Sequence, residues 1–497
     1  MWLFSSPKPP QPATVPSDEI IPLHFWNTAF CMTGTVLDVS LKFDNVLDLT
    51  KLRAALEQLM EIGDWRQLGA RLRMNKDGKY EYHIPTQFDA SRPAFIMTNA
   101  QHETSIVDHP LGAKLPQPTG IPTIFPSPDE LSPYLRSADA PTTIDDWLYS
   151  DLPQLAIHII TFTDATIITI TWIHTLADVM GMTTILNAWT AMLRGEREKI
   201  PKLEGFRSEP LTQLAQRTPA EKYMHFDSVF GKKEFLWFIA SNILQRLWYR
   251  QDERRTICIP AASLKNLCQK ASVELSDPSF CEGETVPFVS ESDVLLAWWV
   301  RALYGGLGLG RAQSILVNNA LNLRTSLHES FNSDDTAYMG NALCMSPTLL
   351  QGCHIADEPL GHIALRIRQS LAQQRTTEQV EAMAALQMQT MEKTGYLVLV
   401  GDPRMTLLSC SNWNKARLFD MDFSSAILQN SVQSNSQQSQ NAGKPSFVNG
   451  VQHSANSFRN VLSVIGKDAG GNWWLTGVLR TDAWAHVEQQ LRELGSN

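Results

Sequence analysis

Residues 167–182, IITITWIHTLADVMGM, change from the pattern of a strand to that of a helix within a few positions. In the first half, isoleucines and Trp172 alternate with threonines, which predicts a strand over 167–173. The apolar residues that follow recur at helical spacing and predict a helix that ends near Arg194. His174 stands on the loop between the two elements.

His174 is the residue that this junction presents. A histidine on the loop leaving a strand can reach into a cleft while the strand holds its backbone still. Its unperturbed pKa of about 6.5 lets it accept and return a proton near neutral pH. The alternative is a hydrogen-bonded core histidine. Asp178 lies where the helix begins, so a plain N-cap explains it, and we expect it to be structural or orienting.

Composition narrows the class of protein. The chain has 497 residues, 43% of them hydrophobic and 19% charged, which predicts a globular protein of two domains. A net charge of −9 argues against nucleic acid or an anionic membrane as the main partner. The seven cysteines are odd in number and lack a C-x-x-C pair, and no signal peptide or membrane span is evident. We expect a cytoplasmic monomer without disulfides.

Several catalytic motifs are missing from the chain. There is no Gly-x-Ser-x-Gly nucleophile elbow, no phosphate-binding Gly-x-x-x-x-Gly-Lys loop and no His-Glu-x-x-His metal site. The glycine-rich residues 305–310 follow a predicted helix rather than a strand, so we interpret them as a turn. The expected chemistry therefore needs no metal.

The rest of the chain predicts a division into two halves. We place an N-terminal domain at 1–205, a crossover linker at 206–230 and a C-terminal domain at 231–497, because the region around the linker is charged and rich in proline. Thr50 and Ser290 are predicted helix N-caps, and residues 88–146 are expected to be mostly loop. A run of Gln, Asn and Ser predicts a disordered surface loop near 429–446.

Five segments, in order along the chain, resemble the motifs of the BAHD-type acyl-CoA-dependent acyltransferases, in the style of fungal O-acetyltransferases of secondary metabolism. The matching segments are residues 65–73 (Gly-Arg-Leu), His174–Asp178 (His-x-x-x-Asp), Asn322–Arg324 (Asp-x-Arg), Tyr338–Asn341 (Tyr-x-Gly-Asn) and Asp422-Phe423 (Asp-Phe-Gly-Trp-Gly). Two departures stand out. Val179 replaces the glycine that usually follows the first aspartate, and residues 424–426 are Ser-Ser-Ala where the family has Gly-Trp-Gly.

The resemblance implies an α/β fold of two similar domains, each a mixed β-sheet flanked by helices as in chloramphenicol acetyltransferase, with a channel between them. It implies that acyl-CoA, by default acetyl-CoA, and a small-molecule alcohol meet at His174, which acts as general base. Asp422 is then expected to form a structural salt bridge with Arg324. For binding of the co-substrate, the candidates are the polar residues Ser424, Ser425 and Asn341.

Two other functions stay open. A non-catalytic or repurposed relative would bind a ligand in the channel without acyl transfer. The altered residues 424–426 are the reason to consider this alternative. A peptide-synthetase condensation domain has the same general fold, but such domains usually carry two adjacent histidines, whereas Ile173 precedes His174 here.

Overall fold

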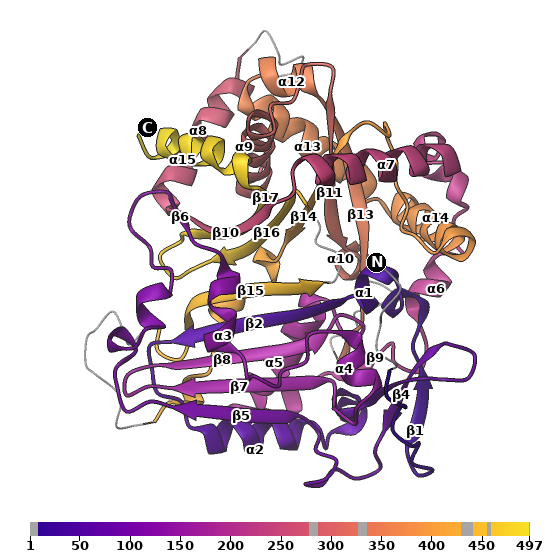
Figure 1. The fold of residues 1–497 in the computed structure, drawn as a ribbon, viewed down its shortest axis with the longest axis vertical. Helices are drawn as coiled ribbons and strands as arrows, with labels where there is room; N and C mark the ends of the chain where they lie inside the picture. Colours follow the sequence, from indigo (N-terminus) through magenta and orange to yellow (C-terminus); the bar gives the residue numbers. More distant parts are fainter. Residues whose placement is uncertain (1–7, 278–286, 327–334, 429–440, 455–458, 497) are drawn as a thin grey trace.

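The computed structural model describes residues 8–277, 287–326, 335–428, 441–454 and 459–496. Its helices and strands form two α/β halves, stacked one above the other in Figure 1. The lower half contains a five-stranded sheet and the upper half a seven-stranded sheet. Both sheets are mixed, which confirms the predicted fold class.

The five-stranded sheet positions the strand that precedes His174. Its strand order is β15-β2-β8-β7-β5, and only the β7–β5 pair is parallel. These strands are Pro445–Ser454 (β15), Thr35–Phe43 (β2), Thr166–Ile173 (β8), Leu155–Thr161 (β7) and Ile96–Gln101 (β5). Every residue of β8 is buried, because the strand is central and the sheet is covered on both faces.

Helices α2 (Leu49–Leu59) and α5 (Val179–Leu193) pack together against one face of this sheet. Their apolar side chains share one core with β2 and β8. The indole Nε1 of Trp189 donates a 2.9 Å hydrogen bond to the backbone carbonyl of Leu52 and so joins the two helices. The predicted helix after His174 is confirmed, and it ends at Leu193.

The seven-stranded sheet has the strand order β13-β11-β14-β16-β17-β10-β6. Helices α8, α9, α13 and α15 share the core on its outer face (Figure 1). The strands are Leu343–Gln351 (β13), Ser314–Asn322 (β11), Thr406–Asn412 (β14), Val461–Lys467 (β16), Trp473–Arg480 (β17), Asp252–Ile259 (β10) and Thr123–Phe125 (β6). The helices are Ala261–Leu275 (α8), Glu291–Gly306 (α9), Leu360–Gln374 (α13) and Trp484–Ser496 (α15).

Each half contributes one strand to the sheet of the other. β15 comes from the C-terminal half but pairs with β2 over nearly its whole length, whereas β6 comes from the N-terminal half and pairs with β10. The division of the chain at residues 205 and 231 stays a prediction about domains, and the sheets themselves cross it in both directions. Pulling the halves apart would break both pairings, so they are tied together by backbone hydrogen bonds.

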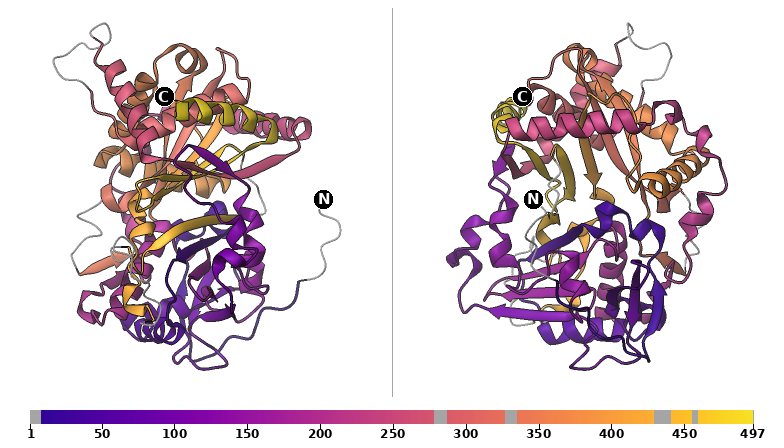
Figure 2. Two further views of the ribbon diagram at one scale, coloured as in Figure 1. Left: turned by 90° about the vertical axis from the view of Figure 1, so that its left-hand side faces the viewer. Right: turned by 45° about the vertical axis from the view of Figure 1, so that its right-hand side comes forward.

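The region around the predicted linker is packed. Helix α6 (Pro210–Leu214) and the short turns after it bury Leu211, Leu214 and Tyr223 against α14 (Thr377–Thr394). Helix α7 (Lys232–Trp248) follows and runs across the outside of the upper half (Figures 1 and 2).

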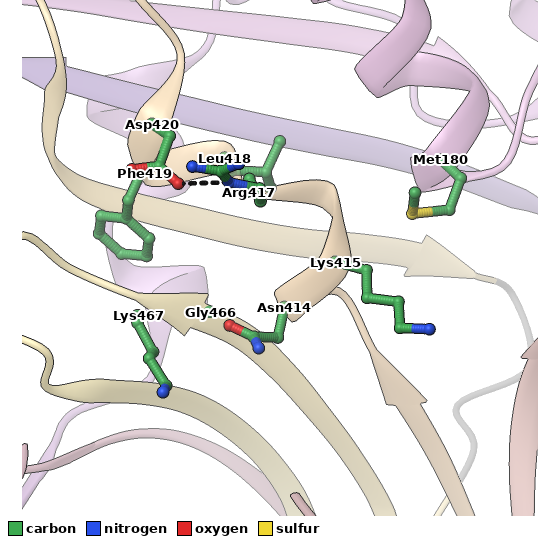
Figure 3. Close-up of a pocket in the computed structure, with 9 residues that line it drawn as sticks. All are labelled: Met180, Asn414, Lys415, Arg417, Leu418, Phe419, Asp420, Gly466 and Lys467. Carbon is green, nitrogen blue, oxygen red and sulfur yellow. Dashed lines mark hydrogen bonds and ion pairs between the residues drawn. The ribbon is translucent and has the colours of Figure 1, made fainter.

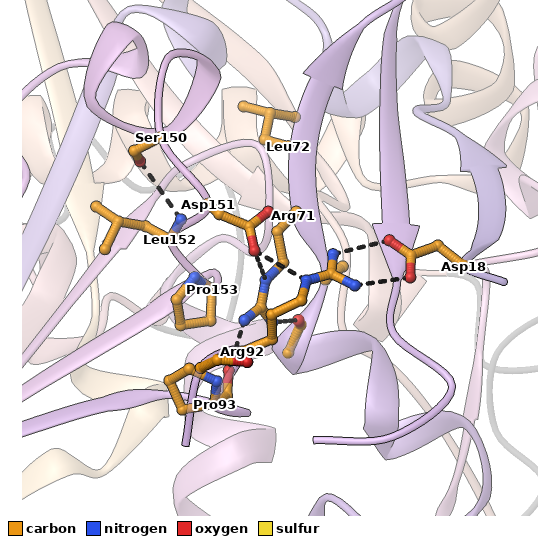
Figure 4. Close-up of polar contacts among 12 residues, drawn as sticks. Asp18, Arg71, Leu72, Arg92, Pro93, Ser150, Asp151, Leu152 and Pro153 are labelled. Atoms are coloured by element: carbon orange, nitrogen blue, oxygen red, sulfur yellow. Dashed lines mark hydrogen bonds and ion pairs between the residues drawn. The ribbon is translucent and has the colours of Figure 1, made fainter. Parts of the chain in front are cut away.

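A small sheet, β1-β4-β3, flanks the N-terminal half and carries a cluster of arginines. Its strands are Glu19–Pro22 (β1), Arg71–Met74 (β3) and Tyr80–Ile84 (β4). Arg92 binds both carboxylate oxygens of Asp18 at 2.8 Å and also binds Asp151 at 2.9 Å (Figure 4). Burial lowers the pKa of Arg71 to about 10, although the charge of Asp151 opposes this shift. The cluster fixes the loop from which β7 starts.

Some sequence predictions were wrong in detail. The N-cap of α2 is Asp48 and not Thr50, because the Asp48 carboxylate accepts the first free backbone N–H groups. Residues 88–146 are mostly loop, as expected, but they also hold β5, β6 and the short helices Ser132–Leu135 (α3) and Ile144–Leu148 (α4), which the sequence did not predict. The predicted loop near 429–446 lies outside the described residues up to 440, but its last part is ordered and enters β15.

Candidate active site

The His174 loop is held at both of its ends. The His174 N–H donates to the carbonyl of Thr35 at 2.9 Å, which extends the β2–β8 pairing by one residue. Across the loop, the indole of Trp172 donates to the carbonyl of Ala177 at 2.9 Å. The loop between strand and helix is therefore short and closed, and it leaves His174 little backbone freedom.

Asp178 is the N-cap of α5, as predicted. One carboxylate oxygen accepts a 2.8 Å hydrogen bond from the N–H of Gly181. The other oxygen accepts from the backbone N–H of Ala342 at 3.0 Å and from Arg324 Nη1 at 2.9 Å. Asp178 thus satisfies a free donor of its own helix and binds two residues of the C-terminal half.

The partner of Arg324 is Asp178, so the predicted salt bridge between Arg324 and Asp422 is wrong. Arg324 also donates to the backbone carbonyls of Tyr338, at 2.8 Å, and of Gly340. Asp422 instead accepts a hydrogen bond from the backbone N–H two residues ahead of it. The carboxylates of Asp178 and Asp422 both have the charge to pair with Arg324. The fold places only Asp178 beside it.

Asn341 holds the loop from the other half of the molecule. Its side-chain amide donates to the backbone carbonyl of His174 at 2.8 Å. The Asn27 side-chain oxygen in turn accepts from the backbone and the side chain of Asn341, both at 2.9 Å. Asn341 was predicted as a residue that binds the co-substrate, and the structure places it at the backbone of His174. No sequence signal pointed to Asn27.

The imidazole of His174 is half-buried. Its Nδ1 atom is fully buried and has no hydrogen-bond partner within the described part of the chain. The side-chain oxygen of Asn341, whose amide binds the His174 carbonyl, is also buried and unpaired within these described residues. Burial lowers the pKa of His174 from its ordinary value of 6.5, and the charge of Asp178 and the amide of Asn341 oppose the shift only in part. The ring is therefore neutral at physiological pH.

Gly181 explains the departure at Val179. A methyl group on Gly181 would lie only 1.8 Å from the backbone carbonyl oxygen of Met339, so the C-terminal half approaches α5 at this residue. Val179 is itself buried in the core of the N-terminal half. The close approach that needs a glycine is thus at position 181, not directly after Asp178.

Ser424 and Ser425 do not lie at the His174 loop. They are exposed and sit next to Phe423, which packs against Phe43 with 5.2 Å between ring centroids. Phe43 is paired with the first residue of β8, whereas His174 follows the last. The two ends of β8 are roughly 25 Å apart at the usual rise of a strand. Ser424 and Ser425 are therefore not placed to contact reacting atoms at His174, and their role in binding the co-substrate stays a prediction.

The Asp422-Phe423 motif supports packing. Phe423 is fully buried and makes edge-to-face contacts with Phe43 and Trp189. The carbonyl of Ala426, three residues on, accepts the backbone N–H of Asp48 at 2.7 Å. The Ser-Ser-Ala segment that replaces Gly-Trp-Gly is thus fitted against the start of α2, well away from the chemistry.

A pocket of about 570 Å³ opens between the first turn of α5 and the C-terminal half (Figure 3). Met180 lines it from α5, and Asn414, Lys415, Leu418 and Lys467 are among the residues that line it from the other half. Lys415 is exposed, and Lys467 pairs with Glu291 at the surface. The sequence did not single out these cations.

Lys415 lies in a basic environment. Although the side chain reaches solvent, partial burial lowers the pKa of its ammonium group, and the positive charges of Arg375 and Arg368 add to this shift. Arg368 is 3.7 Å from the carboxylate of Asp293, so its own charge is partly balanced. An anion bound at Lys415 would relieve the repulsion between these cations.

Comparison with known proteins agrees with this architecture. The model of the Transferase family matches residues 140–448. Acetyltransferase adrJ of Penicillium rubens is 79% identical over 497 residues, which covers 100% of both chains. Acetyltransferase sphE of Aspergillus fumigatus is 37% identical over 495 residues, covering 97% of this chain and 96% of its own.

Among solved structures, TRI101 of F. sporotrichioides, complexed with coenzyme A and T-2, superposes with a TM-score of 0.65. It is 17% identical in sequence, and the match covers 95% of this chain and 97% of that one. At this identity the likeness concerns the fold. The family match and the two curated relatives establish that this chain belongs to the Transferase (BAHD) family and is an acyl-CoA-dependent acyltransferase.

Proposed function

We propose that this enzyme transfers an acetyl group from acetyl-CoA to a hydroxyl group of a small secondary metabolite, with His174 as general base. The observation that carries the proposal is the neutral, half-buried imidazole on a loop held by both halves of the molecule. Two curated relatives named as acetyltransferases support the acyl group, and the T-2 complex of TRI101 supports a small-molecule acceptor.

In the proposed reaction, the unprotonated nitrogen Nε2 of His174 takes the proton of the acceptor hydroxyl. The oxygen attacks the thioester carbonyl, and the tetrahedral intermediate collapses with cleavage of the carbon–sulfur bond. The imidazolium then returns its proton to the thiolate of coenzyme A. Asp178 takes no proton in this scheme, because both of its oxygens already accept hydrogen bonds.

The phosphates of coenzyme A are proposed to bind at Lys415. The pocket there begins at Met180, in the helical turn that directly follows the His174 loop. A phosphate beside Lys415, Arg375 and Arg368 would gain charge-assisted hydrogen bonds and relieve the repulsion between the cations. The thioester end would then extend from the pocket toward the His174 loop.

The test compares His174→Gln with His158→Gln. Both histidines are half-buried and have a pKa lowered by burial, but His158 lies on β7 and bonds Thr98. Release of coenzyme A from acetyl-CoA, with and without candidate alcohols, is followed with a thiol reagent, and products are identified by mass spectrometry. His174→Gln is expected to lose about 10²–10⁴-fold in turnover, and His158→Gln to keep it.

The alternative of a repurposed ligand-binding protein makes a different prediction. In that case coenzyme A release by the wild-type protein would be no faster than by His174→Gln, with every alcohol tried. Equal turnover of the two proteins would also contradict the role of His174 as base.

A further inference from the structure

Helix α7 carries its apolar face outward. Leu236, Trp237 and Trp248 are 67%, 58% and 82% exposed, and Phe238 is the only fully buried residue among its 17. Helices on the surface of a globular domain normally turn their apolar side toward the core. The arrangement here is the reverse, because the exposed side chains of α7 include its large apolar ones. The helix itself lies on the outside of the upper half (Figure 2).

The outward face is continuous. At 100° per residue, the residues from 236 to 248 divide into an apolar half and a half that is mostly polar. The apolar half consists of Leu236, Trp237, Ile239, Ala240, Ile243, Leu244, Leu247 and Trp248, all exposed. The polar residues of the same stretch, Ser241, Asn242, Gln245 and Arg246, all lie in the other half. We call the first set the α7 apolar face.

The helix is anchored so that this face stays outside. Phe238 belongs to the core shared with α14, and its ring lies 5.8 Å from that of Phe230. Phe235 contacts Tyr396 with 4.8 Å between ring centroids. Both anchoring rings come from the side of α7 opposite the α7 apolar face, so rotation of the helix to bury that face would break these contacts.

Positive charge surrounds the α7 apolar face. Lys232 and Lys233 stand at its start and Arg246 and Arg250 near its end, and Glu234 is the one acidic residue of residues 232–250. Arg246 lies 4.0 Å from Asp252, which partly balances its charge, and Asp252 also pairs with Arg459. The chain as a whole carries −9. The two lysines in the first turn also oppose the helix dipole, so they do not serve the stability of the helix. A local excess of cations in an acidic protein fits an anionic surface.

We propose that α7 docks this enzyme on the surface of an anionic lipid bilayer. Aromatic residues with a polar edge, here Trp237 and Trp248, favour the interface between lipid and water. An apolar helix face bordered by lysine and arginine is typical of helices that lie flat in that interface. No helix in the described residues is long and apolar enough to cross a membrane.

This inference differs from the expectation that a membrane is not a partner. That expectation rested on the net charge of the whole chain. Net charge averages over the entire surface, whereas an exposed charge acts over about 8–10 Å at physiological salt. The cations around α7 therefore act on a bilayer that touches α7, and acidic residues on remote surfaces are screened.

The test measures co-sedimentation of the full-length protein with phosphatidylcholine vesicles, with and without phosphatidylserine. The double variant Trp237→Glu/Leu244→Glu should lose at least about 10-fold in vesicle binding, because it places two charges in the α7 apolar face. The matched control is Val107→Glu/Val273→Glu, which makes the same change at valines that are 69% and 73% exposed on other elements. The control should bind like wild type.

A second pair of variants isolates the electrostatic part. Lys232→Gln/Lys233→Gln should weaken binding to vesicles with phosphatidylserine by roughly 5-fold per lysine and leave binding to pure phosphatidylcholine unchanged. Melting temperature and coenzyme A release in solution should stay at wild-type values in all variants, because none of these residues touches the active site.

Three outcomes would overturn the proposal. The first is a wild-type protein that binds neither kind of vesicle. The second is equal loss of binding in the valine control. The third is a dimer in solution, seen by light scattering, that the α7 double variant dissociates, since the α7 apolar face would then belong to a second copy of the chain.

Discussion

The carboxylate of Asp178 and the guanidinium of Arg324 lie 2.9 Å apart, and they join the two halves of the molecule directly behind the His174 loop. Asp178 caps the helix that follows His174, while Arg324 binds the carbonyls of Tyr338 and Gly340 just before Asn341. The same contact therefore positions the loop from both sides. It connects the placement of His174 to the docking of the two halves.

Breaking this pair should destabilise the protein. Arg324→Ala leaves the buried Asp178 carboxylate without its charged partner, which costs about 3–5 kcal/mol of unfolding free energy. Chemical denaturation measures the loss. Asp422→Ala is the matched control, because among the described residues Asp422 binds only a local backbone N–H, and it should cost no more than about 1 kcal/mol. Equal losses in the two variants would contradict the assignment.

Gly181 should not tolerate a side chain. Gly181→Ala places a methyl group 1.8 Å from the carbonyl oxygen of Met339, so the two halves must separate locally. We expect a loss of about 1–3 kcal/mol in stability and a lower kcat, since the His174 loop moves with α5. Gly310→Ala is the control, because its nearest neighbour, a side-chain atom of Gln313, would lie 3.7 Å away. Wild-type kcat in Gly181→Ala would refute the close packing.

The pH dependence of kcat/KM should have its acid limb below pH 6.5. Burial lowers the pKa of His174, so the imidazole stays unprotonated and able to act as base below its ordinary value of 6.5. Activity should be flat around neutral pH and fall only when the pH approaches the lowered pKa. A pH profile with a midpoint above 6.5 would contradict this environment.

The same shift predicts how stability depends on pH. In the unfolded chain His174 binds a proton at pH 6.5, whereas in the folded protein it does so only at lower pH. Its contribution to stability is therefore present above pH 6.5 and is lost as the pH falls from 6.5 toward the folded pKa. As the pH is lowered from 6.5, the free energy of unfolding should fall less in His174→Gln than in wild type, because glutamine does not titrate. Chemical denaturation at several pH values measures the difference.

Lys415 should matter for the nucleotide part of coenzyme A only. Lys415→Ala is expected to raise the KM for acetyl-CoA by about 10-fold, because it removes a charge-assisted contact to phosphate. It should leave the KM for acetyl-pantetheine, which lacks the nucleotide, unchanged. Lys393→Ala, an exposed lysine at the end of α14, is the control. A rise in both KM values for Lys415→Ala would show that the pocket binds another part of the substrate.

Local patterns determined much of this protein. The alternation over 167–173 and the helical spacing after it were enough to predict β8, α5 and the placement of His174 between them, because both elements follow from the residues next to each other in the chain. Asp178 was predicted as an N-cap for the same reason. The mixed α/β class was predicted from the family motifs, which occur in order along the chain. A carboxylate at a helix start satisfies that helix wherever the helix packs.

Only the tertiary structure decided which distant groups meet. The pairing of Arg324 with Asp178 instead of Asp422, the contact of Asn27 with Asn341, and the gathering of cations at Lys415 all join residues far apart in sequence. β15 likewise pairs with β2 in the sheet of the other half, and no local pattern encodes such a crossing. The types of residues in the sequence determine which ion pairs and hydrogen bonds are possible. The energy of each one depends on the distance between the two groups in the folded protein, and the way the sheets are joined sets that distance.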